Sequence, residues 1–576
     1  MNIIVFFSST IIATQLLGAF GLFNRFTVTL VAIGMLAFFL WKNQKIKIPR
    51  ASIFTQLIIP IVFLALIFLT QVTPIYETDS VAYHLPIITQ LAETGSIWDV
   101  YHAAFVGPNT YFPANQQSIQ AFFYVLTGSY AFTALPTLLS ILLFIFAFKT
   151  PQASFRLSTL LAVLLVTSVP FLFEQIVNVQ VDLFSLCLFG SMVCFLYNAH
   201  KSKDEKELTK FFLTAGIFLG TKYNSLPQFI FLIPLIGICF YKLKLGLKKI
   251  STLLFLMILT GSGWYLRNWI IAGNPFFPFE MQLPFITFQG YEPFNGQMAG
   301  TTILDAFKNQ GLIATLKTIK ANTLFTYNLG SSIYVLAGMG ITSVILVFSS
   351  SFKKDPRSNL LPLLAFVYLF IGEIFYYLSS PFTFTLWNQT IRYSAPLFAL
   401  LAVIIVWATL RVPKFKFIIW PLSILIIIHN IFFASFVANP EFLKDKDNFI
   451  AERNDEYKDL LPTIQTLREQ NPRGQNIAVA GILGYWFFEK EGLKPHYINV
   501  DGCNECKYPD YAEPGITVRS FPDKQKWLKA LQERSINYLL VSKENELLES
   551  KWAQEEPQIF EELVESKKHT LYKLEL

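Results

Sequence analysis

Long apolar runs alternate with short polar segments along the chain up to about residue 437. A hydrocarbon core about 30 Å thick is crossed by roughly 20 helical residues, so each run of that length predicts one transmembrane helix. The first run lacks a basic segment before it and the apolar pattern resumes directly after it, so we expect it to be retained. About thirteen spans are predicted, at residues 3–20, 26–41, 52–72, 120–148, 157–173, 183–199, 210–224, 227–241, 250–271, 331–350, 359–378, 393–410 and 417–437.

Beyond residue 438 the pattern changes to short apolar runs separated by charged segments. NIAVAGI (476–482) and INYLLVS (536–542) are typical of buried strands, and KQKWLKALQER (524–534) is typical of a surface helix. We therefore expect an all-α polytopic membrane protein with a small C-terminal α/β domain. The predicted divisions are N-terminal membrane helices (1–51), a main membrane domain (52–437) and a soluble domain (438–576).

Composition supports this fold class. Of the 576 residues, 53% are hydrophobic and only 15% are charged, and the mean hydropathy of +0.45 is higher than a soluble globular protein needs. The net charge of +7 does not indicate a nucleic-acid partner, because the basic residues lie in short loops between apolar runs. The expected surroundings of the chain are membrane lipids.

The basic loops predict the orientation. The span count puts all of them on one side, which should be the cytoplasm. The opposite side would carry a loop at about 73–118 without Lys or Arg, a second long loop at about 272–330, and the C-terminal domain. We expect a multi-pass protein of the cytoplasmic (inner) membrane. The loops are KNQKIKIPR (42–50), KSKDEKELTK (201–210), KLKLGLKK (242–249), SFKKDPR (351–357) and RVPKFK (411–416).

The five cysteines fall into two groups. Cys187, Cys194 and Cys239 lie in apolar runs and are expected to be packed in the membrane. Cys503 and Cys506 form CNEC in the outward C-terminal domain. A single CxxC without a second pair or nearby histidines favours a local disulfide over zinc in an oxidising compartment.

The segment YETDSVAYHLP (76–86) brings polar chemistry to the outer membrane boundary. Glu77, Asp79 and His84 follow directly after an apolar span, and Asp79 and Tyr83 are four residues apart, on one face of a helix. Acidic residues just outside a span are commonly ordinary solvated loop residues. Ionisable residues in or beside the later spans favour a functional role for this segment over an ordinary solvated loop.

Four such charges approach the same outer face, namely Asp182, Lys222, Arg267 and Arg392. Ionisable residues in spans are rare and commonly functional, although Lys222 and Arg392 could also snorkel to the interface. Arginine can hold two phosphate oxygens, and a carboxylate can accept a proton from a hydroxyl. The set therefore suits a substrate that joins a phosphate to a polar acceptor.

Six segments, in this order, resemble the membrane glycosyltransferases of the GT-C superfamily. The resemblance covers roughly residues 52–437. It is closest to the bacterial group that includes the Rgt-type lipopolysaccharide sugar transferases, and more distant to protein O-mannosyltransferases and aminoarabinose transferases. The segments are ETDSVAYHLPIITQLAETGSI (77–97), TYFPANQQ (110–117), VDLF (181–184), GTKYNSLP (220–227), RNWIIAGNPFFPF (267–279) and IRYSAP (391–396).

The resemblance implies an inverting sugar transfer from a polyprenyl-phosphate donor to a glycan, lipid or protein acceptor. It gives Asp79 the role of general base and Asp182 that of a second acidic residue. It assigns Lys222, Arg267 and Arg392 to binding of the donor phosphate. Gln116 or Gln117 stands where relatives often have an acidic residue, so no metal ligand is assigned and a divalent metal stays open. The supporting or acceptor-binding positions are Glu77, Tyr83, His84, Asn115 and Asn268.

Two other functions remain as alternatives. A secondary transporter would also gather charges among helices, but it should show paired half-structures and charges nearer the bilayer midplane. A non-catalytic scaffold or receptor, with the C-terminal domain as its binding module, would account for the domain plan but not for cations opposite Asp79.

Overall fold

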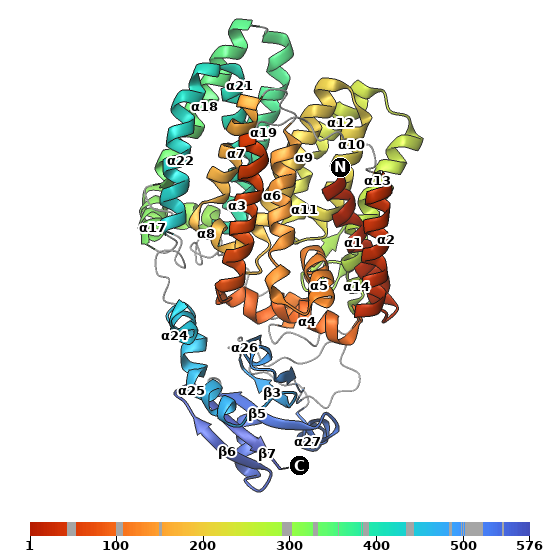
Figure 1. Cartoon of the computed structure of the whole chain (residues 1–576), viewed down its shortest axis with the longest axis vertical. Helices are drawn as coiled ribbons and strands as arrows, with labels where there is room; N and C mark the ends of the chain where they lie inside the picture. Colours follow the sequence, from red (N-terminus) through yellow and green to blue (C-terminus); the bar gives the residue numbers. More distant parts are fainter. Residues whose placement is uncertain are drawn as a thin grey trace.

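A helical bundle with an α/β region at one end makes up the computed structural model of the chain (Figure 1). Cys503, Cys506 and their predicted disulfide lie outside the described residues. The structure describes residues 1–42, 53–98, 107–148, 153–290, 302–325, 332–354, 356–381, 383, 391–433, 443–482, 486–496, 498, 500, 522–543 and 547–575.

Helices dominate the chain as far as Phe433. The bounds are α1 (Asn2–Ala19), α2 (Arg25–Lys42), α3 (Ile53–Val72), α4 (Leu85–Thr94), α5 (Asn115–Thr127), α6 (Leu135–Ala147), α7 (Ala153–Thr167), α8 (Pro170–Phe173), α9 (Asp182–Ser202), α10 (Glu205–Leu219), α11 (Ser225–Ile230), α12 (Ile233–Leu243), α13 (Leu247–Gly261), α14 (Gly263–Ala272), α16 (Ile303–Gln310), α17 (Leu312–Phe325), α18 (Ser332–Lys354), α19 (Pro356–Ser379), α21 (Ala395–Arg411) and α22 (Lys416–Phe433).

The predicted spans are reproduced in part. Within the described ranges, six helices are long and apolar enough to cross a membrane, or up to eight if each of two bent helix pairs forms one span. The prediction of one span at 120–148 is wrong, because α5 ends at Thr127 and α6 begins at Leu135. The second outer segment, predicted as a loop, contains α16, α17 and a hairpin of β1 (Met281–Leu283) with β2 (Ile286–Phe288).

Small residues let the helices approach closely. A Cβ added at Gly190 of α9 would lie 2.3 Å from the Phe144 ring of α6, and one at Gly216 of α10 would lie 1.9 Å from Thr260 Oγ1 of α13. Without a hydrophobic driving force between helices in lipid, such close packing is what holds them together. The helix α9 packs against α6, α10, α12 and α21, and Asp182 is its first residue.

The C-terminal region contains a five-stranded sheet of order β4-β3-β5-β7-β6, in which β3 is parallel to β4 and β5, and β7 is antiparallel to β5 and β6. The predicted strands at 476–482 and 536–542 correspond to β3 and β5, and the predicted helix corresponds to α27. The bounds are α24 (Lys446–Ala451), α25 (Asp455–Glu469), β3 (Asn476–Ala480), α26 (Trp486–Lys490), β4 (Lys494–His496), α27 (Lys524–Glu533), β5 (Ile536–Ser542), α28 (Leu548–Glu555), β6 (Phe560–Glu565) and β7 (His569–Leu574).

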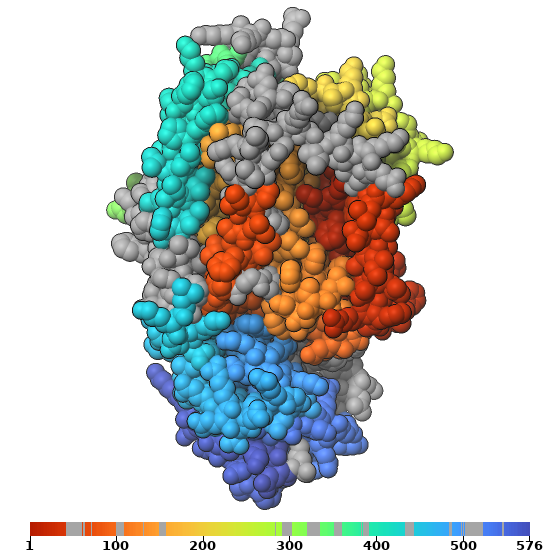
Figure 2. All heavy atoms as spheres, viewed as in Figure 1, coloured from red at the N-terminus to blue at the C-terminus, as the bar shows by residue number. Residues whose placement is uncertain are grey.

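This region packs against the segment 73–118 of the bundle and against Tyr130, and the space-filling view shows the two parts in contact (Figure 2). Asn454 Nδ2 donates a hydrogen bond to the Tyr76 carbonyl at 2.9 Å, and Thr89 Oγ1 donates to Glu489 Oε1 at 2.8 Å. The rings of Trp486 and Tyr130 meet edge to face at 5.6 Å. The C-terminal region is therefore anchored on both sides of the segment that contains Asp79.

Candidate active site

A single π-helical turn, Ser80–His84, links the predicted catalytic loop to α4. Turns of this kind often occur at functional sites. The backbone N–H and the hydroxyl of Ser80 both donate to Glu77 Oε2 at 2.8 Å, so this carboxylate caps the turn. Asn178 Oδ1 accepts hydrogen bonds from the backbone of Tyr76 and Glu77, each at 3.2 Å. These contacts fix the position of Asp79 between them.

Asp79 and Arg392 form an ion pair that joins the first outer segment to the start of α21. The distance from Asp79 Oδ2 to Arg392 Nη2 is 2.5 Å, and both side chains are partly exposed. Among the residues that the structure describes, Arg392 Nε has no hydrogen-bond partner. A buried donor of this kind is costly unless something occupies it. The guanidinium therefore retains hydrogen-bonding capacity for a bound anion.

A second ion pair lies beside the first. Lys222 Nζ is 2.9 Å from Asp182 Oδ1, and the other oxygen of Asp182 accepts a hydrogen bond from Gln175 Nε2 at 3.3 Å. Asp182 is the first residue of α9, and the macrodipole of a helix favours negative charge at its N-terminus. Lys222 Nζ also lies 5.0 Å from the ring centroid of Tyr393, the residue after Arg392. Two carboxylates and two cations are thus brought into one cluster.

Tyr83 and His84 form the buried wall of this cluster. Their ring centroids are 4.2 Å apart, and Gln117 Nε2 donates a hydrogen bond to His84 Nδ1. Burial lowers the pKa of His84 to about 3, so the imidazole is neutral and accepts this bond. A small cavity of about 10 Å³ separates these two residues from Lys222.

The two carboxylates of the loop have opposite pKa shifts. Burial, together with the neighbouring charge of Asp79, raises the pKa of Glu77 to about 7. Burial also favours the neutral form of Asp79, but the nearby charge of the Arg392 guanidinium, with a smaller contribution from Lys222, outweighs it and lowers the pKa of Asp79. Environments that separate two carboxyl pKa values in this way often divide acid and base roles. Near neutral pH, Asp79 is charged while Glu77 titrates.

Arg267 is placed differently from the other predicted cations. It is 1% exposed, and its Nε donates to the Ile97 carbonyl at 2.7 Å while its Nη1 faces the Thr110 carbonyl at 3.4 Å. The guanidinium also lies over the Trp264 ring at 5.4 Å. These contacts join two parts of the segment 73–118 through backbone carbonyls.

The two predicted asparagines also make helix and loop contacts. Asn268 Nδ2 donates to the Tyr111 carbonyl at 2.6 Å and to the Tyr223 hydroxyl at 2.9 Å. Asn115 Nδ2 donates to the Thr260 carbonyl at 2.9 Å, which ties α5 to α13. Both side chains are fully buried. The structure therefore leaves both side chains in contacts outside the Asp79 cluster.

Several residues of the site were absent from the sequence-based prediction. Gln175 orients Asp182, and Asn178 holds the loop backbone. Ser80 donates to Glu77, while its hydroxyl accepts a hydrogen bond from the Val179 backbone N–H at 3.1 Å. The available signal is the run EQIVNVQ (174–180), in which amide side chains interrupt two apolar segments.

No group of three or more His, Cys, Asp or Glu residues suited to a metal ion occurs in the described part of the chain. Gln116, which stands where an acidic residue was considered, donates to the Gln180 carbonyl at 3.1 Å and to Thr137 Oγ1 at 3.2 Å. Its amide is a poorer cation ligand than a carboxylate. Among the described residues, Gln116 therefore offers this position an amide in place of a carboxylate.

Comparison with known proteins identifies the fold. No family model and no curated protein match the chain. The crystal structure of ArnT from Cupriavidus metallidurans bound to undecaprenyl phosphate matches with a TM-score of 0.52 and 12% identity, covering 91% of this chain and 98% of that one. ArnT is an aminoarabinose transferase of the GT-C superfamily, so the predicted resemblance in fold is confirmed. The closer likeness to the Rgt-type group stays a prediction.

Two further solved structures show weaker similarity. One is ArnT from Cupriavidus metallidurans in the apo state, with a TM-score of 0.42 and 12% identity, covering 90% of this chain and 97% of that one. The other is the archaeal oligosaccharyltransferase AglB from Archaeoglobus fulgidus in complex with an inhibitory peptide and a dolichol-phosphate. It has a TM-score of 0.40 and 12% identity, and the match covers 85% of this chain and 70% of that one.

Proposed function

We propose that the chain is a membrane glycosyltransferase that moves a sugar from a polyprenyl-phosphate donor to an extracytoplasmic acceptor. The observation that carries this proposal is the Arg392–Asp79 ion pair beside the Lys222–Asp182 pair. The fold shared with a transferase solved with undecaprenyl phosphate supports the donor class. The acceptor would be a hydroxyl of a cell-envelope glycan, lipid or protein.

Arg392 is proposed to hold the donor phosphate. Its planar fork can bind two phosphate oxygens, and its Nε has no partner among the described residues. An arriving phosphate would compete with Asp79 for the guanidinium and so release the carboxylate. Donor binding would thereby prepare the base, because Asp79 is then free to accept a hydrogen bond from the acceptor hydroxyl.

The proposed reaction is a single displacement at the anomeric carbon. The acceptor oxygen attacks, its proton passes to Asp79, and the bond from the anomeric carbon to the phosphate oxygen breaks with its electron pair. The products are an inverted glycoside, protonated Asp79 and the polyprenyl phosphate. Arg392 and Lys222 would stabilise the negative charge that develops on the leaving phosphate.

Asp182 and Glu77 are given supporting roles. Asp182 orients Lys222 through the 2.9 Å ion pair. Glu77 holds the π-helical turn through Ser80, so its carboxylate is already engaged. We further propose that Arg267 holds the outer segment in place through backbone carbonyls, and that Arg392 and Lys222 alone carry the phosphate role.

The proposed site faces the extracytoplasmic side of the inner membrane, together with the C-terminal domain (438–576). The one-sided basic loops support this orientation. Single cysteines introduced at exposed positions beyond residue 443 should react with a membrane-impermeant maleimide in intact spheroplasts. Labelling only after lysis would place the C-terminal domain and the Asp79 cluster in the cytoplasm and contradict the proposal.

Mass spectrometry of cell-envelope glycans and glycoproteins, with and without the gene, tests the function. A sugar that disappears with the gene and returns with the wild-type gene, but not with Asp79→Asn, would identify both sugar and acceptor. An unchanged set of envelope sugars, with the protein present at normal levels in the membrane, would contradict sugar transfer.

A further inference from the structure

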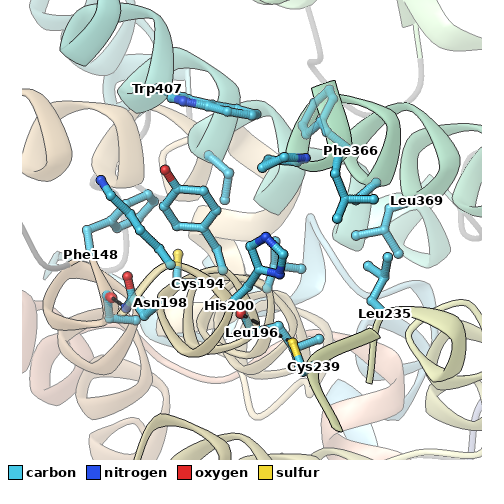
Figure 3. A pocket seen from close by; sticks show the side chains of 18 of the residues that line it. Phe148, Cys194, Leu196, Asn198, His200, Leu235, Cys239, Phe366, Leu369 and Trp407 are labelled. Carbon is cyan, nitrogen blue, oxygen red and sulfur yellow. Dashed lines mark hydrogen bonds between the residues drawn. The ribbon is translucent and has the colours of Figure 1, made fainter. Parts of the chain in front are cut away.

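A large cavity lies at the end of the bundle opposite the C-terminal region. It has a volume of about 480 Å³, within the range of small-molecule pockets. Five helices line it, namely α6, α9, α12, α19 and α21. In Figure 3, His200 lies between two apolar walls, one with Phe148 and Trp407, the other with Leu235, Phe366 and Leu369.

The cavity has a mainly apolar lining. Most lining side chains are aliphatic or aromatic, and two of the polar ones are engaged with backbone carbonyls. Asn198 Nδ2 donates to the Ala147 carbonyl at 3.0 Å, and Cys239 Sγ lies 3.7 Å from the Leu196 carbonyl. An apolar lining of this kind gains dispersion contacts from an apolar occupant. In a membrane, an alkyl chain is the natural occupant.

The rim of the cavity is basic. Lys201 Nζ lies 5.8 Å from the Tyr197 ring, and Arg411 lies 5.9 Å from the Trp407 ring. Each of these rings lines the cavity. These two cations come from α9 and α21, so positive charge gathers at one mouth of an apolar cavity.

A third cation, from α12, completes the rim. Lys242 Nζ donates to Nε2 of His200, which also lines the cavity, at 2.9 Å. The acidic residues beside the rim are engaged elsewhere, because Asp204 caps α10 and Glu205 pairs with Lys249. In the described part of the chain no carboxylate forms an ion pair with Lys201 or Lys242.

We propose that this cavity binds one acyl chain of an anionic phospholipid, with the lipid phosphate at the rim formed by Lys201, Lys242 and Arg411. Basic pockets between transmembrane helices on the cytoplasmic side are known to hold anionic lipid headgroups. The site is separate from the Asp79 cluster, because α9 runs 21 residues, roughly 30 Å, between Asp182 and Ser202. It does not depend on the proposed sugar transfer.

Brominated lipids can test this site, because Trp407 lines the cavity. The purified full chain is reconstituted in phosphatidylcholine bilayers, and brominated phosphatidylglycerol or brominated phosphatidylcholine is titrated in. Tryptophan quenching should saturate at lower concentrations of the phosphatidylglycerol. Trp407→Phe should remove this component, which assigns it to the cavity.

Variants of the rim and the wall complete the test. Lys201→Ala combined with Lys242→Ala should weaken the preference for phosphatidylglycerol by at least about fivefold, since each basic residue near the surface contributes on the order of that factor. Lys244→Ala, directly after the end of α12, is the matched control and should leave the preference unchanged, because in the described part of the chain Lys242 and not Lys244 is bonded to a lining residue. Ala365→Phe, which fills the cavity from its wall without adding a tryptophan, should abolish the Trp407 quenching.

Equal quenching by the two brominated lipids would overturn the proposal, as would an unchanged preference in the double lysine variant. Loss of the Trp407 component in Arg392→Ala would also overturn it, because that result would place the quenching lipid at the Asp79 cluster.

Discussion

Arg392 and Arg267 both lie near the end of the bundle that faces the C-terminal region, and sequence patterns alone do not separate them. Arg392 faces a carboxylate, Asp79, in a partly exposed cluster. Arg267 is 1% exposed and faces the carbonyls of Ile97 and Thr110. A carboxylate is an anion that another anion can replace, whereas neutral carbonyls hold the guanidinium as part of the fold. We therefore expect the partner, and not the residue type, to distinguish a phosphate-binding arginine from a structural one.

The comparison predicts that removing the base will have the largest effect. Asp79→Asn keeps the shape of the side chain but cannot accept the proton, and general-base catalysis contributes about a hundredfold to ten-thousandfold. We expect the purified variant to bind donor lipid but to transfer sugar at least about a hundred times more slowly. Initial rates of labelled-sugar transfer measure this effect.

Glu77→Gln is the matched control for the base. It lies two residues away and its amide oxygen can still accept hydrogen bonds from Ser80. We expect near-normal transfer. If Glu77→Gln loses transfer while Asp79→Asn keeps it, Glu77 and not Asp79 is the base.

The second prediction concerns Arg267. Arg267→Ala removes the donors of buried carbonyls, and each unsatisfied buried group costs about 1–3 kcal/mol. We expect the free energy of unfolding to fall by about 2–4 kcal/mol, measured by thermal unfolding in detergent with Arg392→Ala as the control. A larger loss of stability in Arg392→Ala than in Arg267→Ala would reverse the comparison.

The third prediction concerns the geometry of the phosphate contact. Arg392→Lys keeps the positive charge but loses the two-pronged fork. Donor binding should therefore weaken by about tenfold, less than in Arg392→Ala, because part of the charge-assisted bonding remains. Equal affinities of Arg392→Lys and wild type, measured by donor titration, would show that a point charge is sufficient.

The smallest effect is expected from Glu77 and depends on pH. Its pKa is raised from its ordinary value to about 7, so the stability it contributes is full below about pH 4.5 and is lost as the pH rises through 7. Glu77→Gln does not titrate. Relative to wild type, the variant should gain on the order of 1 kcal/mol in stability between pH 5 and pH 8. A difference in melting temperature that stays constant with pH would contradict the raised pKa.

The sequence was sufficient for the features that depend on local patterns. Apolar runs of membrane length predicted most of the helices, and alternating short strands predicted β3 and β5. Charges that the apolar pattern placed on one face meet in the structure, where Asp79 pairs with Arg392 although more than 300 residues separate them. Ionisable residues in or beside spans are rare and face the interior of the bundle, because exposure to lipid is costly. Their positions in the sequence therefore indicate which residues can meet in the structure.

Backbone partners could not be predicted in the same way. Arg267 bonds to carbonyls 170 and 157 positions away, and any residue type presents the same carbonyl. Asn115 and Asn268 are engaged in similar contacts, so motif membership alone could not tell a ligand contact from a structural one. The break between α5 and α6 was missed because the segment joining them, GSYAFTA (128–134), is largely apolar.

Binding of undecaprenyl phosphate and of undecaprenol by the purified chain in neutral bilayers tests the central claim most directly. If Arg392 holds the donor phosphate, wild type should bind the phosphate form at least about tenfold more tightly than the alcohol. Arg392→Ala should lose most of this preference, whereas Lys201→Ala combined with Lys242→Ala should keep it. Equal binding of the two lipids by wild type, or an undiminished preference in Arg392→Ala, would contradict the account.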